Sequence, residues 1–197
     1  MPDANLIHTS PAQLKNLRNK TVLITGGSSG IGLATAQMVA SLSDTNNVII
    51  VDRSPPPANI SIPSSRLLFQ KCEITNWVQQ RAAFAAGAKK FGRIDAVFVN
   101  AGIAEYGDQF FKEEFDADGL LKEPDRRCLD IDMNAACDTV RLAIHHLRKN
   151  GKEGRYANSH ESSKFDGLYA NLLTSRWVNC YDRESGRISG ERWSAFI

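Results

Sequence analysis

The sequence lacks a long apolar run, a block of charge of one sign and a closely spaced pair of cysteines. No apolar run approaches the roughly 20 residues that span a bilayer, and the polar segment Met1–Lys20 has no signal-peptide core. The four cysteines form no C-x-x-C pair, which argues against a zinc site and against a secreted disulfide framework. These absences predict a soluble, cytoplasmic protein.

The charged residues are nearly balanced in sign and form no block: 24 basic and 22 acidic residues are spread along the chain. Nothing in this distribution calls for nucleic acid or an anionic membrane as a partner, so small-molecule chemistry is the expectation. The adjacent histidines His145 and His146 face different sides of a predicted helix, and we therefore expect no metal site there. A chain of 197 residues, 42% of them hydrophobic, suffices for one domain with a sizeable core.

Strand and helix signals alternate along the chain. Short apolar runs without polar alternation predict strands buried on both faces, as in a parallel sheet covered by helices. Alternation of this kind predicts a doubly wound α/β sheet. The predicted strands are 20–25, 47–52, 67–72 and 95–100, and the predicted helices are 30–42, 76–91 and 124–151.

Helix boundaries and faces follow from the same patterns. Thr75 is the expected cap of the second helix, Gly92 its end, and Pro124 the first-turn residue of the longest helix. Of the two long loops, 54–65 is expected to be a surface excursion, while 106–123 is either a lid or a packed connector. The expected apolar faces are Ile31, Ala34, Met38 and Leu42 in the first helix, and Leu129, Met133, Cys137, Val140, Ile144 and Leu147 in the longest.

The stretch TGGSSGIG, residues 25–32, stands where the first predicted strand passes into the first helix. A tight turn built of Gly26, Gly27, Ser28, Ser29 and Gly30 lets backbone approach a ligand without an intervening Cβ. Its free N–H groups lie at a helix start, where the helix dipole favours an anion, so a pyrophosphate is the natural ligand. Gly32, one turn into the helix, would allow close packing on the sheet.

Asp52 strengthens this interpretation. It ends the second predicted strand about twenty residues beyond the glycines, where a carboxylate accepts hydrogen bonds from the hydroxyls of an adenosine ribose. A carboxylate at this place repels a 2′-phosphate and favours NAD. Arg53 beside it could bind that phosphate, which keeps NADP open as the alternative.

At these residues the chain resembles the short-chain dehydrogenase/reductase family, over about residues 20–151. The resemblance implies a Rossmann-like doubly wound parallel sheet, in this chain incomplete at its C-terminal side. The motifs that carry it are residues 25–32, Asp52, Cys72-Glu73-Ile74-Thr75, Val99-Asn100-Ala101-Gly102 and Asn134 in the stretch DMNAA.

The resemblance also implies roles for individual residues. Glu73 and Ile74 would lie beside the adenine, and Asn134 resembles the helix asparagine that holds a water in the family's proton relay. The 124–150 helix is a common oligomer contact in the family, so a homo-oligomer is an expectation. The implied cofactor-binding set is Gly26, Ser28, Ser29, Gly30, Ile31, Gly32, Asp52, Arg53, Glu73, Ile74, Asn100, Ala101 and Gly102.

One element of the family's chemistry is missing from the sequence. Members use a tyrosine and a lysine four residues later to transfer the alcohol proton, with a serine to position the substrate oxygen. None of the four tyrosines is followed by a lysine at that spacing. Ser163 lies roughly where the family's serine follows the fifth strand, but no apolar strand precedes it.

The chain changes character after the longest helix. Residues 155–197 show no strand pattern and no long amphipathic helix. We therefore divide the chain into an N-terminal extension (1–19), an NAD(P)-binding domain (20–151) and a divergent tail (152–197). An altered reading frame, a retained intron or a genuine truncation is the hypothesis for the tail.

Three functional hypotheses follow. The first is an NAD(P)-dependent oxidoreductase that acts on an alcohol or ketone by hydride transfer. The second is a non-catalytic NAD(H)-binding or regulatory module, which keeps the nucleotide half without the proton relay. The third is a truncated product without function.

Overall fold

The computed structural model describes residues 17–104 and 113–150. Ser163 and the tail 152–197 lie outside this part of the chain. The described strands form one parallel sheet in the order β3-β2-β1-β4, which confirms the predicted α/β class. The strands are β1 (Thr21–Thr25), β2 (Asn47–Asp52), β3 (Leu67–Lys71) and β4 (Ala96–Phe98).

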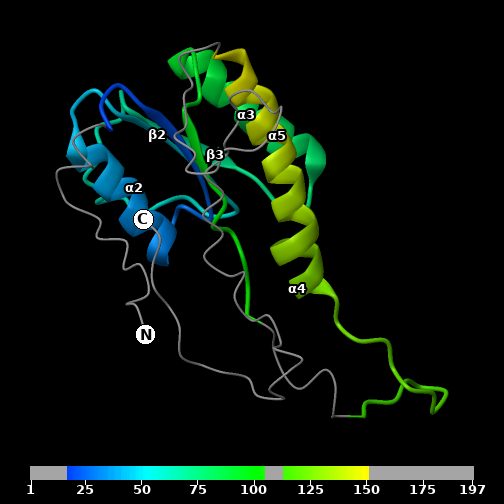
Figure 1. The fold of residues 1–197 in the computed structure, drawn as a ribbon. Helices are drawn as coiled ribbons and strands as arrows, with labels where there is room; N and C mark the ends of the chain where they lie inside the picture. Colours follow the sequence, from blue (N-terminus) through cyan, green and yellow to red (C-terminus); the bar gives the residue numbers. More distant parts are fainter. Residues whose placement is uncertain (1–16, 105–112, 151–197) are drawn as a thin grey trace, which may run out of the picture.

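Helices cover both faces of the sheet. Figure 1 shows α2 on one face, and α3 with α5 on the other. A short turn of α-helix, α4, and a π-helical turn, η1, lead directly into α5. The bounds are α2 (Gly30–Leu42), α3 (Trp77–Phe91), α4 (Arg127–Leu129), η1 (Asp130–Ala135) and α5 (Ala136–Lys149).

The continuous apolar runs of β1 and β2 reflect burial on both faces. Leu23, Ile49 and Val51 point into the cluster under α3 and α5. Their neighbours in sequence, including Ile24 and Ile50, point into the cluster under α2. Because successive side chains of a strand alternate between faces, a strand covered on both sides must be apolar throughout.

β4 lies at the edge of the described sheet. It pairs with β1 on one side, and the described residues supply no strand on its other side. Val97 and Val99 are buried on the side of α3 and α5, while Ala96 and Phe98 are only half-buried on the side of α2. Within residues 17–104 and 113–150 the sheet therefore ends at this strand.

Two predicted helix boundaries were wrong. The cap of α3 is Asn76, whose side chain accepts a hydrogen bond from the amide of Gln79, and not Thr75. Asparagine and threonine both cap well, so composition alone could not choose between neighbours. The longest helix begins at Arg127 and not at Pro124. The predicted end of α3 at Gly92 is confirmed.

The predicted apolar face of α2 was also wrong. Ile31 is 64% exposed, whereas the buried residues of the helix are Gly32, Ala36, Val39 and Ala40. Small side chains allow the helix axis to approach the sheet closely, so the alanine-rich face packs against the strands. Of the other predicted residues, Ala34 is exposed, and Met38 and Leu42 are only half-buried.

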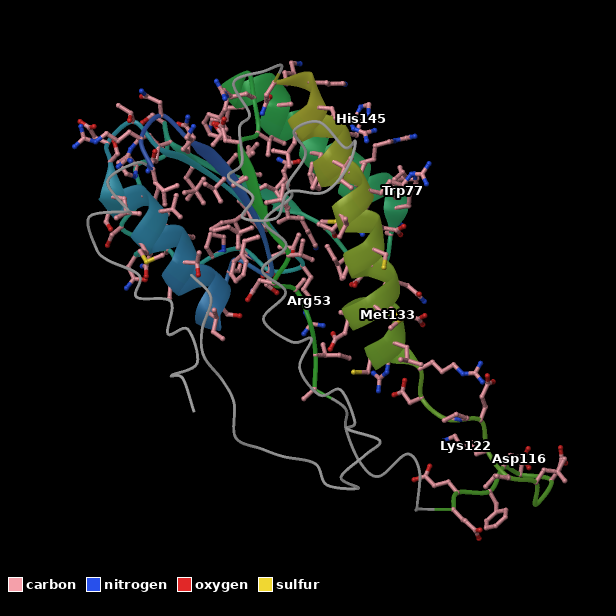
Figure 2. All side chains as sticks on the ribbon, in the orientation of Figure 1. Arg53, Trp77, Asp116, Lys122, Met133 and His145 are labelled. Atoms are coloured by element: carbon pink, nitrogen blue, oxygen red, sulfur yellow. The ribbon has the colours of Figure 1, made fainter. Side chains whose placement is uncertain are left out.

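Only the end of the apolar stripe predicted for the longest helix lies on its packed face: Leu147 is buried, and Val140 and Ile144 are half-buried. Leu129, Met133 and Cys137 are exposed, and Figure 2 shows Met133 on the lower part of this helix. The π-helical turn lies between Leu129 and Cys137, so a stripe counted at α-helical spacing does not stay on one face across it. Within α5 the buried face runs through Ala136, Thr139 and Ala143, one position before the predicted Cys137, Val140 and Ile144. The buried residues of η1 and α5 are Ala135, Ala136, Thr139, Leu142, Ala143 and Leu147.

A buried polar bridge joins α3 to the longest helix. Gln80 is 1% exposed, and its Nε2 donates to the carbonyls of Ile74 (2.5 Å) and Ala135 (3.3 Å). Its Oε1 accepts a hydrogen bond from the Thr139 hydroxyl at 2.8 Å. One amide side chain thus satisfies groups on two helices and in the loop after β3.

We expect Gln80→Ala to lower the free energy of unfolding by about 1–3 kcal/mol, because it leaves buried polar groups without their partner. Urea unfolding monitored by circular dichroism measures this loss. Arg81→Ala, at the exposed neighbouring position of α3, is the matched control and should change stability by less than about 0.5 kcal/mol. Equal stability of the two variants would contradict a structural role for the bridge.

His146 makes the stability of the fold depend on pH. Its ring packs on Phe84 with ring centroids 5.4 Å apart. Burial, followed by the nearby His145 and Lys149, lowers the pKa of His146 below its ordinary value of 6.5. The unfolded chain therefore binds this proton more readily than the folded chain, and stability should decline as pH falls below about 6.5.

Thermal unfolding between pH 7.5 and 5.5 checks this expectation. His146→Leu, which cannot titrate, should flatten the decline, while His145→Gln at an exposed position should keep most of it. An unchanged decline in His146→Leu would assign the pH dependence to other groups.

Candidate functional site

A cavity of about 400 Å³ opens at the carboxyl ends of the strands. In a parallel sheet flanked by helices this edge is where ligands bind, because the loops that follow the strands converge there. Four of the predicted motifs meet at this cavity: the glycine turn, the end of β2, the loop after β3, and the loop after β4. Its lining residues are Gly26, Ser29, Gly30, Ile31, Val51, Asp52, Arg53, Cys72, Glu73, Ile74, Asn100, Ala101, Gly102, Ile103 and Ile131.

The glycine turn is compact because its backbone touches neighbouring backbone. Gly26 adopts φ +64°, and a Cβ there would lie 2.9 Å from the Cα of Ala101. A Cβ on Gly32 would lie 2.2 Å from the carbonyl oxygen of Gly26. The close contact of Gly32 is therefore with the turn itself, whereas the sequence had predicted contact with the sheet.

The first turn of α2 faces the cavity without a cap. Ser29 is the N-cap residue, yet its side chain makes no capping hydrogen bond, and the first turn contains no acidic residue. In α3, by contrast, the side chain of Asn76 fills this role. An uncapped helix start, lining a cavity beside a glycine turn, presents backbone N–H groups and a positive dipole end to an anion.

Asp52 links the end of β2 to the glycine turn. One carboxylate oxygen accepts a hydrogen bond from the amide of Ser28 at 3.0 Å, and the other accepts from the amide of Ser54 at 3.1 Å. The Ser28 hydroxyl donates to the carbonyl of Ser54 at 2.6 Å. The carboxylate is only half-buried and lines the cavity, so it shapes the turn and also faces the ligand space.

Asn100 and Thr25 lock the loop after β4 against the same turn. The side-chain amide of Asn100 donates to the carbonyls of Thr25 and Gly26, each at 3.1 Å. The Thr25 hydroxyl oxygen accepts from the amides of Asn100 and Ala101 at 3.0 and 3.1 Å. This part of the predicted motif thus braces the turn after β1, in addition to lining the cavity.

The loop after β3 forms another wall. Glu73 and Ile74 line the cavity as expected, and the Glu73 amide donates to the side chain of Gln79 at 2.7 Å. Cys72 lies beside them; burial and, secondarily, the charge of Glu73 raise its pKa to about 11. The thiol is therefore protonated at neutral pH, and Cys72 is a wall residue and not a nucleophile.

Most of the predicted cofactor-binding residues line this cavity. Ser28 and Gly32 do not: Ser28 is 7% exposed and holds the loop after β2, while Gly32 makes the close contact with Gly26. The lining residues that sequence reasoning missed are Val51, Cys72, Ile103 and Ile131. The first three flank predicted positions and could have been added by adjacency, but Ile131 lies on η1 and no local signal places it here.

A second hollow of about 750 Å³ adjoins the first. Arg53, Glu73, Ile103 and Ile131 line both, so these residues form the boundary between the two. Figure 2 labels Arg53 at the end of the sheet that faces the lower part of the long helix. The remaining lining residues are Thr75, Arg127, Asp130, Asn134, Ala135 and Asp138.

Asn134, the predicted proton-relay residue, lies in this second hollow and does not line the first. Its side-chain amide donates to Asp130 at 3.0 Å, and it is exposed. It belongs to η1, and π-helical turns occur frequently at functional sites. The structure therefore places Asn134 in the hollow that adjoins the cavity, and not in the cavity itself.

Residues 17–104 and 113–150 contain no group of three or more His, Cys, Asp or Glu side chains that could hold a metal ion. No helix within them is long and apolar enough to cross a membrane.

Comparisons with known proteins agree with this geometry. The chain is 37% identical over 143 residues to the short-chain dehydrogenase/reductase ascJ of Acremonium egyptiacum, covering 73% of this chain and 47% of that protein. It is 35% identical over 141 residues to the short-chain dehydrogenase/reductase prx4 of Penicillium rubens, covering 72% of this chain and 40% of that protein. The chain thus spans about half the length of the curated relatives it matches.

Solved structures give the same result. A 3-ketoacyl-(acyl-carrier-protein) reductase from Brucella melitensis, complexed with NADH, is similar with a TM-score of 0.55 and 28% identity, over 70% of this chain and 54% of that one. A short-chain type dehydrogenase/reductase from Mycobacterium marinum matches with a TM-score of 0.56 and 23% identity, covering 73% of this chain and 56% of that one, which supports the fold alone.

The model of the family described as short chain dehydrogenase matches residues 20–159, well over half of the chain. This match covers the glycine turn, Asp52, the loop after β4 and the long helix. With the Rossmann-like arrangement of sheet and helices, it leads to one conclusion: the chain belongs to the short-chain dehydrogenase/reductase family.

Proposed function

We propose that this chain binds a nicotinamide dinucleotide in the cavity at the carboxyl ends of β1, β2 and β4. The observation that carries the proposal is the cavity itself. An uncapped helix start, a glycine turn closed by backbone contact, and the carboxylate of Asp52 converge on one space of about 400 Å³. These are the features that a diphosphate and an adjacent ribose require.

Each part of the cavity has an assigned role in this proposal. The turn and the first residues of α2 bind the diphosphate through backbone N–H groups, with Gly26, Ser29, Gly30 and Ile31 in contact. Asp52 accepts hydrogen bonds from the adenosine ribose. The adenine lies against Glu73 and Ile74, while the loop Asn100–Gly102 borders the nicotinamide side. Ser28 and Gly32 support the turn from behind and do not touch the ligand.

The preferred dinucleotide in this proposal is NAD, with NADP as the alternative. The carboxylate of Asp52 at the cavity wall repels a 2′-phosphate. The exposed Arg53 next to it offers a cation for that phosphate. A like charge held in place by two backbone amides disfavours the phosphate more consistently than a mobile exposed side chain favours it, so NAD is the first choice.

The proposed activity is that of an oxidoreductase that acts on an alcohol or ketone. The bound dinucleotide would supply or accept the hydride. Asn134 is the proposed relay residue, placed one wall away from the cavity. The sequence has no tyrosine followed by a lysine four residues later, so a non-catalytic NAD(H)-binding module is the second candidate.

Two measurements test the proposal and separate its alternatives. Titration of the full chain with NADH, followed by the fluorescence of the dinucleotide, should give saturable binding, and a folded chain without affinity for NAD(H) or NADP(H) would refute it. Consumption of NADH with a panel of carbonyl compounds then distinguishes an oxidoreductase from a binding module. Binding without turnover supports the module.

A further inference from the structure

The loop after β4 is tied to the long helix through Ile103. The Ile103 amide donates to Oδ1 of Asp132 at 2.9 Å. The Cys128 thiol lies within hydrogen-bonding distance of the Ile103 carbonyl (3.7 Å) and of Oδ2 of Asp132 (3.6 Å), and it can donate to one of them at a time. The two helix residues are one turn apart, so together they contact both polar backbone groups of one loop residue.

This contact lies at the boundary between the two hollows. Ile103 lines both of them, and so does Ile131, the residue just before Asp132. The loop 100–103 is also tied to the glycine turn through Thr25 and Asn100. Its two ends are therefore held by different elements: Asn100 by the turn, and Ile103 by the helix.

Asp132 reaches the loop from the π-helical turn η1. π-Helical turns are rare and occur frequently at functional sites. Asp132 and Ile131 are half-buried and lie toward the loop, whereas Met133 and Asn134 are exposed. An aspartate in this position offers a charged acceptor to a backbone N–H, the stronger class of hydrogen bond.

We propose that Asp132 is a positioning residue for the dinucleotide cavity. With Cys128 it holds Ile103, and it thereby fixes the wall formed by Ala101, Gly102 and Ile103 relative to the glycine turn. The inference rests on the proposed function for its effect on binding. The tie between Asp132 and Ile103 is a property of the chain without ligand and is tested without one.

The first test is hydrogen exchange of the Ile103 amide, measured by NMR on the full chain without dinucleotide. Asp132→Ala should speed exchange of this amide by at least about tenfold, because it removes a charged acceptor. Asp132→Asn keeps an acceptor oxygen and should restore most of the protection. Unchanged exchange in Asp132→Ala would overturn the proposal, whether or not the chain binds NADH.

The second test is NADH affinity in the same variants. Asp132→Ala should weaken NADH binding by about tenfold, because it removes the acceptor that holds the Ile103 amide. Asp132→Asn keeps an acceptor oxygen and should recover most of the affinity. The matched control is Asp138→Ala, another half-buried aspartate of the long helix, which lines the second hollow and not the first. It should leave both the Ile103 exchange and the NADH affinity unchanged.

The outcomes separate the two proposals. If the native chain does not bind NADH, the proposed function fails while the exchange experiment still decides the tie. If the native chain binds NADH and Asp132→Ala loses protection at Ile103 but not affinity, the positioning role is overturned. If Asp132→Ala does not fold, Cys128→Ala is the second variant, since it removes the weaker thiol donor. It should speed exchange of the Ile103 amide by a smaller factor. Unchanged exchange in this variant would count against the proposal.

Discussion

Gly32→Ala should weaken dinucleotide binding by at least about tenfold and lower the stability of the fold. The added Cβ would lie 2.2 Å from the carbonyl oxygen of Gly26, which is backbone and cannot rotate away. Overpacking costs about 1–3 kcal/mol, and a backbone contact this short belongs at the upper end. Relief of the contact must move the turn, so NADH affinity should fall by at least about tenfold as charged hydrogen bonds to the diphosphate are lost.

Gly87→Ala is the matched control, since Gly87 is also a helix glycine with a close neighbour. A Cβ there would lie 2.4 Å from Cδ1 of Ile49, the end of a flexible side chain that can change its rotamer. This variant should repack and bind NADH as the native chain does. Fluorescence titration and urea unfolding of both variants measure the two effects. Native affinity in Gly32→Ala would show that the turn does not contact the ligand.

Asp52→Ala should weaken NADH binding by about ten- to a hundredfold. The variant loses the ribose acceptor and also releases the Ser28 amide, and hydrogen bonds to a charged group contribute about 1.5–3 kcal/mol each. Thermal unfolding should show a smaller loss, since the carboxylate is only half-buried. Parallel titrations with NADH and NADPH are the measurement.

Asp52→Asn separates charge from hydrogen bonding. It keeps one acceptor oxygen and removes the negative charge, so the ratio of NADH to NADPH affinity should fall. Asp44→Ala, an exposed aspartate lining a different hollow of the described chain, should change neither affinity. An unchanged ratio of NADH to NADPH affinity in Asp52→Asn would show that other residues, Arg53 first among them, determine which dinucleotide is preferred.

Much of the fold could be predicted because its signals are local. The centres of β1 and β2 are continuously apolar, Val22–Ile24 and Val48–Val51, and a strand between two helix layers requires this pattern. The glycine turn could also be predicted from the sequence, because no other residue type permits the close contact at Gly26. For the same reason most of the cavity wall was identified in advance, at the ends of strands where loops must converge.

The errors arose where packing depends on partners distant in the sequence. The buried face of α2 is its alanine face, since helix and sheet approach closely there, and hydrophobicity alone favoured Ile31. In the long helix the buried face of α5 lies one position before most of the predicted stripe, and it includes Ala136, Thr139 and Ala143, which hydrophobicity alone does not select. Ile131 was not predicted as a cavity residue because it lies in a π-helical turn, and no propensity rule signals such a turn.

The double duty of Asp52 restricts how this site can change over evolutionary time. Its carboxylate ties down the glycine turn from the tip of the neighbouring strand while also facing the ligand. A lineage that exchanged this residue to admit a phosphorylated cofactor would loosen the turn at the same step. Adaptation toward that cofactor should therefore begin at Arg53 or Ser54, and replacement of the aspartate should follow only after another group has taken over the Ser28 amide.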